Sequence, residues 1–466
     1  MAYDAIVIGA GMSGLATAIR LGMFEKKVLL LEKHSIPGGL NSYYQRRNFD
    51  KGGVRQFDVG LHALTNFIQK GEKGKPFSKL LKQLRLSYDD FKLCPQSFSE
   101  IHFPEAILKF SNDFLLLEEE VRRVFPGEID RFQKLTQHII DFNELDLSLG
   151  YSSSRAVLKT FLHDPLLIEM ILCPLLIYGS AWEEDMDFAQ FVVMFKSIYL
   201  EGFARPQGGV RTIISLLMNK IKELGVETRF KTAVSKIVTN DQGEIQGVEA
   251  GGEFLAAKQV FSSMGLPETM TLAKNEGSKL PAVGKMTFLE SILVYDRKFT
   301  KTEKESTIVF YNDSSRYHYR PSVGAFDSSS AVVCFPDNYE PGNLDGEGTA
   351  RVTFIANYDE WKDLPRVNYD EKKEEVALKA QALIKKLSPD FSGKLLFKDV
   401  FSPLTIERYT WHLNGTVYGS TEKSRDGKTE FKNLFIIGTD QGFLGIVGSL
   451  LSGISMANLH GLMEVK

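Results

Sequence analysis

Apolar and polar positions over residues 3–33 predict a strand, a tight turn, a helix and a second strand. Residues 3–8 form an apolar, β-rich run, and residues 13–21 combine helix-forming residues with small ones. A second apolar run, KVLLLEK, follows at residues 27–33. Strands that alternate with helices in this way are typical of an α/β sheet. We therefore predict a βαβ unit in this part of the chain.

The pattern changes twice further along the chain. Residues 76–200 indicate mainly helices, among them the apolar stretch PLLIEMILCPLLIYG. Residues 285–360 instead hold short apolar runs separated by Gly, Asp, Ser and Asn, which predicts strands. A charged amphipathic helix is predicted at residues 369–387. Together these segments predict an antiparallel sheet capped by helices.

Composition and charge narrow the class of protein. With 466 residues, 43% hydrophobic and 25% charged, the chain has the composition of a soluble globular protein and the length for two or three domains. The formal net charge of -3 argues against a general nucleic-acid binder. Cys94, Cys173 and Cys334 form no C-x-x-C pair, so we expect buried thiols and no metal site.

The chain shows no signal for export or for a membrane span. No apolar run approaches the roughly 18 residues of a membrane-spanning helix. No charged leader, apolar signal core or transit peptide precedes the first predicted strand. We expect a cytoplasmic location, with contact to a membrane surface left open.

The turn between the first predicted strand and helix carries the motif G-x-G-x-x-G at Gly9, Gly11 and Gly14. Glycines at these places permit a tight turn and let backbone N–H groups approach a pyrophosphate, whose charge the helix N-terminus favours. Glu32 follows Gly14 by 18 residues, near the spacing of about 20 expected for an acid that binds a ribose hydroxyl. Strand, turn, helix and acid together predict a dinucleotide-binding site.

Three segments resemble the cofactor segments of the flavin-binding amine oxidase and phytoene desaturase superfamily. They are LEKHSIPGGLNSYYQRRNFDKGGVRQFDVGLHAL, with a GG pair and a D-x-G turn; RPQGGVRTIISLLMNKIKELGVETRFKTAVSKI, with a P-x-GG turn, a helix and a strand; and NLFIIGTDQGFLGIVGSLLSGISMAN. Their glycines are also compatible with simple packing in an α/β sheet, but three segments in the family's order favour the resemblance. It implies FAD as the cofactor.

The resemblance also implies a fold class and a division into domains. The fold class is α/β, with a discontinuous Rossmann-like FAD-binding domain, an antiparallel-sheet substrate domain and a helical cap. We expect the FAD-binding domain at residues 1–65, 205–265 and 425–466, a helical cap and substrate region at 66–204, and an antiparallel-sheet substrate domain at 266–424.

Residues of each segment receive a cofactor-binding role from the resemblance. The GG pair is expected to cross the pyrophosphate, Val234 to touch the adenine, and Asp440 to accept hydrogen bonds from ribityl hydroxyls. A helix beginning near Gly445 or Ile446 would aim its positive end at the flavin pyrimidine. The expected FAD-binding residues are Gly9, Gly11, Met12, Ser13, Gly14, Glu32, Lys33, Gly38, Gly39, Leu40, Gly60, Leu61, His62, Val234, Gly438, Asp440, Gly445, Ile446, Val447 and Ser449.

Two further stretches narrow the resemblance to carotenoid isomerases, retinol saturases and related desaturases. They are LLIYGSAWEEDMDFAQFVVMFKSIYLEGFARPQGG and SPLTIERYTWHLNGTVYGS. Such enzymes transfer hydride between a carbon–carbon bond of a long apolar polyene and flavin N5, or use reduced flavin for cis–trans isomerisation. The resemblance therefore implies an FAD-dependent oxidoreductase whose protein part supplies orientation and a dry apolar slot.

His62 and Arg205 are the candidates for catalysis. His62 follows the D-x-G turn and would face the flavin as hydrogen-bond donor or proton shuttle, or else be structural. Arg205 stands where relatives tend to have an aromatic residue, and would anchor an acidic substrate group, stabilise reduced flavin, or pair with Glu201. Trp411 and His412 would either wall the cavity or pack their loop.

Residues 70–85 form a basic segment with an apolar stripe. Five lysines and an arginine oppose one acid there. The apolar positions, spaced i, i+3, i+4 and i+7, are Phe77, Leu80, Leu81 and Leu84. Such a helix lies on a membrane surface, or turns its apolar side to the core while its lysines are solvated.

Several alternatives remain open from the sequence. The substrate is expected to be an apolar small molecule, but an amine or a tetrapyrrole-type ring is the alternative, and a non-catalytic flavoprotein is a weaker one. The glycine motif occurs once, so we expect no tightly bound NAD(P). Oxygen, a quinone or a separate reductase would then reoxidise the flavin.

Overall fold

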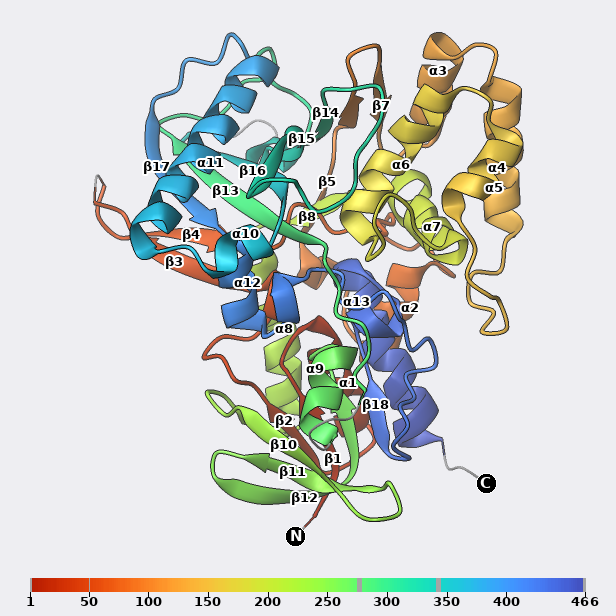
Figure 1. Cartoon of the computed structure of the whole chain (residues 1–466), viewed down its shortest axis with the longest axis vertical. Helices are drawn as coiled ribbons and strands as arrows, with labels where there is room; N and C mark the ends of the chain where they lie inside the picture. The colour runs from red at the N-terminus through yellow and green to blue at the C-terminus, as the bar shows by residue number, and fades with distance from the viewer. Residues whose placement is uncertain (1, 50, 275–278, 341–344, 464–466) are drawn as a thin grey trace.

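The computed structural model describes residues 2–49, 51–274, 279–340 and 345–463, which form two seven-stranded sheets, two short ribbons and surrounding helices (Figure 1). The first sheet occupies the lower part of Figure 1, and the second sheet and a group of helices lie side by side above it. The expected domains also include residues 1, 50, 275–278, 341–344 and 464–466, which lie outside the described residues.

The first sheet has a parallel core. In spatial order its strands are β10 (Val234–Thr239), β11 (Ile245–Ala250), β12 (Glu253–Ser262), β1 (Tyr3–Ile8), β2 (Val28–Leu31) and β9 (Glu227–Arg229), with β18 (Leu434–Ile436) also paired to β12. β9, β2, β1, β12 and β18 pair in parallel, whereas β10 and β11 are antiparallel. The central strands β1 and β2 are buried almost throughout, because helices cover the sheet.

The helices around this sheet come from distant parts of the sequence. They are α1 (Met12–Gly22), α2 (Pro76–Leu84), α8 (Val210–Glu223), α9 (Leu266–Ala273) and α13 (Gly445–Met456). α1 is almost fully buried and packs against both α8 and α13. The strand–helix–strand unit predicted from residues 3–33 is therefore confirmed, and it is completed by segments more than 200 residues away in the sequence.

The second sheet is nearly all antiparallel. In spatial order its strands are β17 (Leu395–Phe401), β13 (Thr287–Tyr295), β16 (Gly348–Ala356), β15 (Phe326–Cys334), β14 (Ile308–Asn312), β6 (Ser99–His102) and β7 (Ile107–Phe110). The pairing of β14 with β6 is parallel. The two ribbons are β3 (Tyr43–Arg47) with β4 (Val54–Asp58), and β5 (Leu93–Pro95) with β8 (Ala204–Pro206).

Helices cover both faces of the second sheet. α11 (Arg366–Leu387) packs on one face, near the short helices α10 (Asp359–Lys362) and α12 (Pro403–Thr410). The other face shares a core with α3 (Leu115–Val124), α4 (Ile129–Asp141), α5 (Ser154–Phe161), α6 (Pro165–Gly179) and α7 (Phe188–Phe195). Among the described residues, no helix has the length and apolar character that crossing a membrane requires.

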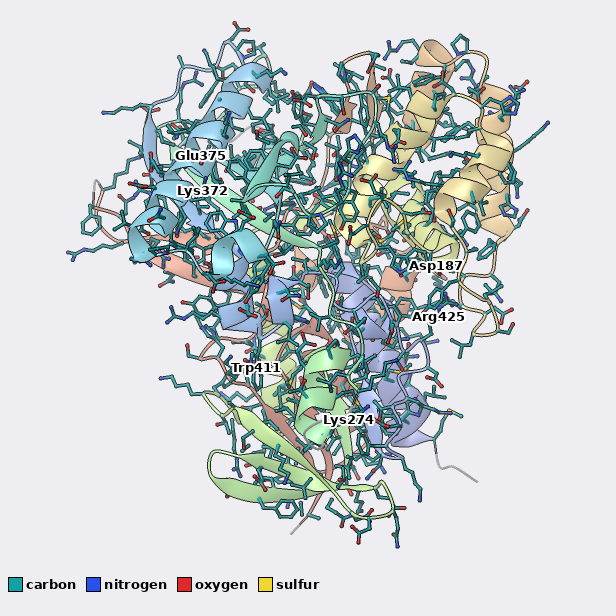
Figure 2. All side chains as sticks on the ribbon, viewed as in Figure 1. Asp187, Lys274, Lys372, Glu375, Trp411 and Arg425 are labelled. Carbon is teal, nitrogen blue, oxygen red and sulfur yellow. The ribbon has the colours of Figure 1, made fainter. Side chains whose placement is uncertain are left out.

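An ion pair joins the helical group to the C-terminal segment. Asp187 precedes α7 and lies beside Arg425 (Figure 2). Arg425 Nη2 is 2.7 Å from Asp187 Oδ2, and both side chains are largely buried. The ion pair thus fixes the helices against the segment that leads into β18.

The α/β fold class is confirmed, with two corrections in the substrate part. Residues 66–204 were expected to be a helical region, but β5, β6 and β7 lie there and the last two extend the second sheet. The sheet was expected to be antiparallel, but β6 joins it in parallel. The strands were missed because each has only three or four residues, too few for a clear alternation.

The basic segment is a helix whose apolar stripe belongs to the core. Phe77, Leu80 and Leu84 of α2 are fully buried, and α2 packs against α1 and α13. Its lysines are exposed. The structure therefore corresponds to the second of the two interpretations, and this stripe is not available for insertion into a membrane.

Candidate functional site

A cavity lies where the two sheets and the helical group meet. It is lined by the ends of β1 and β2, the start of α13, strands β13 and β16, and α6. Its volume is about 310 Å³, within the roughly 300–1,000 Å³ of ligand sites in proteins. The cavity is continuous from the glycine turn of the first sheet to strands β13 and β16 of the second.

Most of the residues expected to bind FAD line this cavity. They are Gly9, Gly11, Met12, Ser13, Glu32, Lys33, Gly38, Gly39, Leu40, Gly60, His62, Val234, Gly445, Ile446 and Ser449. They come from three parts of the sequence, and the first sheet brings them to one place.

The start of α1 forms a cradle for a charged group. Gly11 is the N-cap of α1, with no capping side chain and no acid in the first turn, so the first N–H groups of the helix point to the cavity without such partners. A Cβ added at Gly11 would meet nothing within 4 Å, which shows open space in front of the turn. The Gly38 N–H donates to Ala10 O (2.8 Å), so the GG pair crosses beside the same turn. The arrangement suits a pyrophosphate.

Glu32 accepts a hydrogen bond from the glycine turn, and its carboxylate can still accept hydrogen bonds from a ribose. Its Oε2 accepts the Ala10 N–H and its Oε1 accepts the His34 N–H, both at 2.7 Å. Each carboxylate oxygen can accept a second hydrogen bond. Lys33 Nζ lies 4.8 Å from the ring centroid of Trp411, which stands in the loop after α12 and lines the cavity (Figure 2). Trp411 and His412 both belong to the cavity wall.

A second helix N-terminus, that of α13 in the C-terminal part of the chain, faces the cavity. α13 begins at Gly445 after the N-cap Leu444, which gives no side-chain cap, and its first turn has no acid. Leu444, Gly445 and Ile446 line the cavity. This terminus would favour negative charge on a bound ring.

Five of the expected cofactor residues lie outside the cavity lining: Gly14, Leu61, Gly438, Asp440 and Val447. Gly14 brings α1 close to β1, where an added Cβ would overlap the carbonyl oxygen of the glycine turn. Leu61 and Val447 have buried side chains in the hydrophobic core between the first sheet and the helices α1, α2, α8 and α13. These residues do not line the cavity.

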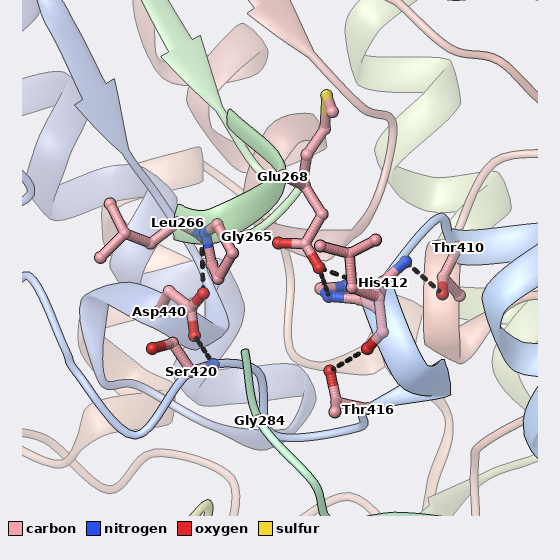
Figure 3. A network of polar contacts seen from close by, with 12 residues as sticks. Gly265, Leu266, Glu268, Gly284, Thr410, His412, Thr416, Ser420 and Asp440 are labelled. Atoms are coloured by element: carbon pink, nitrogen blue, oxygen red, sulfur yellow. Dashed lines mark hydrogen bonds and ion pairs between the residues drawn. The ribbon is translucent and has the colours of Figure 1, made fainter. Parts of the chain in front are cut away.

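The expectation that Asp440 binds ribityl hydroxyls is contradicted by its position. Its carboxylate accepts hydrogen bonds from Leu266 N (2.6 Å) and Ser420 N (2.9 Å), as Figure 3 shows. Lys423 Nζ lies 3.0 Å from the same carboxylate, whose side chain is fully buried. The preceding residue, Thr439, lines the cavity in its place.

Arg205 lies in β8 and holds in place the turn that follows Asp58. It pairs with the carboxylate of Asp58 and donates to two backbone carbonyls of the turn after it (2.7 and 3.0 Å). It is outside the cavity lining. Glu201, the partner expected from the sequence, instead accepts a hydrogen bond from Asn66. The expected pair of Arg205 with Glu201 is therefore wrong, and Arg205 instead pairs with Asp58.

A compact polar cluster forms in the cavity around His62. His62 Nδ1 is 3.2 Å from Tyr178 Oη, and His62 Nε2 is 3.2 Å from Glu290 Oε1. Thr353 Oγ1 lies 3.2 Å from His62 Nε2 and donates to the Glu290 carboxylate. Glu290 and Thr353 face each other across the β13–β16 pair. Four different elements thus supply the cluster.

Arg351 ties this cluster to the turn that carries His62. Its Nε donates to Glu290 Oε1 (2.6 Å), and its other nitrogens donate to the backbone carbonyls of Val59 and Leu61. Its side chain is 3% exposed. The position of the Val59–His62 turn is therefore coupled to the charge state of the cluster.

Burial and neighbouring charges set the protonation states. Burial alone would raise the pKa of Glu290, but Arg351 and His62 outweigh it and hold the pKa at about 2. Burial lowers the pKa of His62 by more than Glu290 raises it. Burial also raises the pKa of Tyr178 well above its ordinary value. At neutral pH the cluster therefore holds a carboxylate, a neutral imidazole and a neutral phenol.

The sequence pattern points to His62, but the partners of His62 were not expected from it. Glu290 is the one acid within the apolar run FLESILVYD, and Arg351 opens the run RVTFIANY. A charge inside an apolar strand implies a buried partner, so these two residues carried a usable signal. Tyr178 and Thr353 carried none, because tyrosine and threonine are ordinary residues at such positions.

A second buried pair lies at another wall of the cavity. His412 lines the cavity, and its Nδ1 is 3.9 Å from Glu268 Oε1, which accepts the Leu413 N–H at 2.8 Å (Figure 3). Glu268 Oε2 has no hydrogen-bond partner among the described residues. Burial raises the pKa of Glu268 to about 7, more than the backbone hydrogen bond lowers it.

Replacing Glu268 by glutamine is expected to flatten the pH dependence of stability. The folded-state pKa lies above the unfolded one, so the stabilising contribution of Glu268 is complete below the unfolded pKa and is lost as pH rises through about 7. A shift of this size corresponds to about 3 kcal/mol. Urea unfolding at a series of pH values between about 5 and 8.5 measures the loss in the native chain and its reduction in E268Q. Glu119→Gln, at an exposed position, is the control, and equal pH profiles for E268Q and the native chain would refute the assignment.

Comparisons with known proteins agree with this geometry. The profile of the family "Flavin containing amine oxidoreductase" matches residues 12–459. Prolycopene isomerase of Arabidopsis thaliana is 27% identical over 98% of this chain and 82% of its own. All-trans-retinol 13,14-reductase of Danio rerio is 24% identical over 98% and 85%. A crystal structure of an oxidoreductase from Methanosarcina mazei superimposes with a TM-score of 0.65 at 19% identity, covering 97% and 99% of the two chains.

Proposed function

Because the chain belongs to the flavin containing amine oxidoreductase family, and its cofactor is accordingly FAD, we propose that this oxidoreductase acts on carbon–carbon bonds of a long apolar isoprenoid or polyene. The reaction classes are desaturation, saturation and cis–trans isomerisation. Two similar proteins are a prolycopene isomerase and an all-trans-retinol 13,14-reductase, which supports a polyene substrate.

The observation that carries this proposal is the wall of the cavity beyond the cofactor residues. The side chains there are mostly apolar: Ile177, Met194, Phe288, Leu289, Val332, Val417 and Leu444. The polar cluster of His62 lies in the same wall. A long hydrocarbon gains free energy from leaving water in such a slot, and it needs few polar contacts.

The chain positions the reactants and excludes water. Bound FAD supplies a hydride acceptor or donor at flavin N5. The start of α1 would hold the pyrophosphate, and the start of α13 would favour negative charge on the flavin ring. The apolar walls orient the hydrocarbon and keep the site dry. We further propose that the flavin is reoxidised by oxygen, a quinone or a separate reductase, without tightly bound NAD(P).

A specific observation keeps the amine-oxidase alternative open. Three tyrosines, Tyr178, Tyr409 and Tyr418, line the cavity, although no tyrosine pair was evident in the sequence. Aromatic rings attract a cationic amine. However, the carboxylate in this region, Glu290, is already neutralised by Arg351 (2.6 Å), so a protonated amine would find no free anion beside it.

The purified protein is expected to carry flavin and to convert a polyene. Its absorption spectrum, taken before and after extraction with organic solvent, should show flavin bands and reveal any copurified polyene. The protein is then incubated anaerobically with prolycopene, all-trans-retinol, phytoene or putrescine, once with oxidised and once with reduced flavin. Chromatography of the products identifies the substrate class. Turnover of putrescine alone would establish the amine alternative, and conversion of none of the four would refute the polyene proposal.

A polar substitution in the cavity wall is expected to weaken polyene binding without loss of flavin. Val417→Asn places an amide against the hydrocarbon, and the lost apolar contact should raise KM about tenfold. Val323→Asn is the matched control, because Val323 is 95% exposed and remote from the cavity lining. An unchanged KM in V417N, at equal flavin content, would place the substrate elsewhere.

A further inference from the structure

We propose that Tyr178 is the proton acceptor at this site and that His62, held by Glu290, takes the proton on from it. The inference rests on the proposed function and deepens it, because it assigns a residue to the proton that leaves carbon when hydride leaves the neighbouring carbon. In this assignment the resting protonation states of Tyr178 and His62 suit dehydrogenation, in which a proton is removed from carbon.

Tyr178 has the position that this role requires. It stands near the end of α6 and lines the cavity, whose wall also contains Ile177, Phe288 and Val332. Its ring packs edge-on against Phe310, with 5.1 Å between the ring centroids. Its hydroxyl has one hydrogen-bond partner among the described residues, His62 Nδ1 at 3.2 Å. The phenol oxygen is therefore a polar atom that an apolar chain in the cavity can approach, with a path for a proton behind it.

The partners of His62 fix the direction of this path. Glu290 is an acceptor only, so His62 Nε2, 3.2 Å away, carries the imidazole proton and donates it. In a neutral imidazole the other nitrogen, Nδ1, is then an acceptor. Tyr178 consequently donates its O–H to Nδ1, and the remaining lone pairs of its oxygen are free to accept a proton from carbon.

The surroundings of His62 support a transient positive charge on the ring. The titratable and charged groups that face it are Glu290 of β13, Arg351 of β16, Arg205 of β8, Tyr178 of α6 and Cys334 of β15, whose Sγ is 3.7 Å from the His62 carbonyl oxygen. The two arginines oppose an imidazolium, but Glu290 is the group in contact with the ring and stabilises it. Histidine between an acceptor carboxylate and a hydroxyl is the arrangement of a general base.

The step balances without a further reactant. Two C–H bonds on adjacent carbons break and a C=C bond forms. One hydrogen leaves as hydride with its electron pair and reduces the oxidised flavin. The other leaves as a proton to the Tyr178 oxygen, while the Tyr178 phenolic proton passes to His62 Nδ1. The product is an imidazolium paired with Glu290, and the same residues donate the proton in the reverse direction.

The charge state of His62 tests the inference without a substrate. The chain has eight histidines, so nitrogen-15 NMR of histidine-labelled protein can resolve them, and His62→Gln identifies the signal. We expect a neutral ring at neutral pH with the proton on Nε2, in protein with and without FAD. An imidazolium, or a proton on Nδ1, would overturn the proposal. Glu290→Gln should remove the preference for the Nε2–H tautomer.

The reductive half-reaction tests the role of the hydroxyl. Anaerobic mixing of the oxidised holoenzyme with phytoene is expected to bleach the flavin, and Tyr178→Phe should slow this by about 10²–10⁴-fold at unchanged flavin content. The native rate should fall as pH is lowered through the pKa of His62, and H62Q should lose this pH dependence. Tyr199→Phe is the matched control, because the Tyr199 hydroxyl donates to Ile171 O in the core (3.0 Å).

The outcomes separate the two proposals. Bleaching by the native holoenzyme and an equal rate in Y178F would overturn the role of Tyr178 and leave the proposed function intact. A native holoenzyme that is inert toward phytoene, prolycopene and all-trans-retinol would overturn the proposed function, and this inference with it. Slow flavin bleaching in Y178F, together with the native rate in Y199F, supports both proposals.

Discussion

Replacing Arg351 by methionine is expected to lower the free energy of unfolding by about 3–5 kcal/mol, because it leaves Glu290 as a buried charge without its cation. The Arg351 and Glu290 side chains are 3% and 12% exposed, and they are joined at 2.6 Å. Arg351 also satisfies the carbonyls of Val59 and Leu61. Methionine has a similar length but no donor, so three acceptors lose a partner at once.

Denaturant unfolding of the flavin-free protein measures this loss. The double variant R351M/E290Q should recover a large part of it, since the uncompensated charge is then gone. Arg366→Met is the control: Arg366 pairs with Asp370 on α11, but its side chain is 80% exposed, and exposed pairs contribute only about 0–1 kcal/mol. If R351M were no less stable than R366M, the buried pair would not hold the cluster together. Flavin content should also fall in R351M, because the Val59–His62 turn lines the cofactor side of the cavity.

Features that depend on neighbouring residues in the sequence could be predicted. The strand–turn–helix of residues 3–21 needs only local alternation and three glycines, and it appears as β1 and α1. The long helix α11 was predicted on the same kind of local signal, whereas the start of α13 was implied by the resemblance to the family. Burial of a whole strand or of one helix face is a property that a short window of sequence already contains.

Features that depend on register or on distant partners could not be predicted. His62, Tyr178, Glu290 and Arg351 come from a turn, a helix and two strands, and their meeting depends on how β13 and β16 pair. Asp440 shows the sensitivity to a single position: its neighbour Thr439 faces the cavity, whereas Asp440 faces the protein. The apolar stripe of α2 was ambiguous because a core and a membrane impose the same spacing on a helix.

Two neighbouring glycines of the same motif are expected to respond in opposite ways to alanine. Gly14 faces the first sheet, and a Cβ there would overlap the carbonyl oxygen of Gly9. Both partners are backbone, so α1 must move away from β1, and the core between α1, α8 and α13 opens. We expect G14A to lose about 3 kcal/mol or more of unfolding free energy, and to lose FAD as a consequence.

Gly11 differs because its Cβ would point into the cavity. It has φ −70° and ψ 176°, a conformation that alanine adopts, and an added Cβ would meet nothing within 4 Å. G11A should therefore fold with native stability or gain about 0.4–1 kcal/mol from the stiffer unfolded chain. Its methyl group would stand before the first N–H groups of α1, the proposed site of the pyrophosphate, so the Kd for FAD should rise at least about tenfold. Thermal unfolding of the flavin-free variants and fluorescence titration with FAD separate the two effects. Equal destabilisation of G11A and G14A, or native FAD affinity in G11A, would mean that the open space in front of the turn is not the pyrophosphate site.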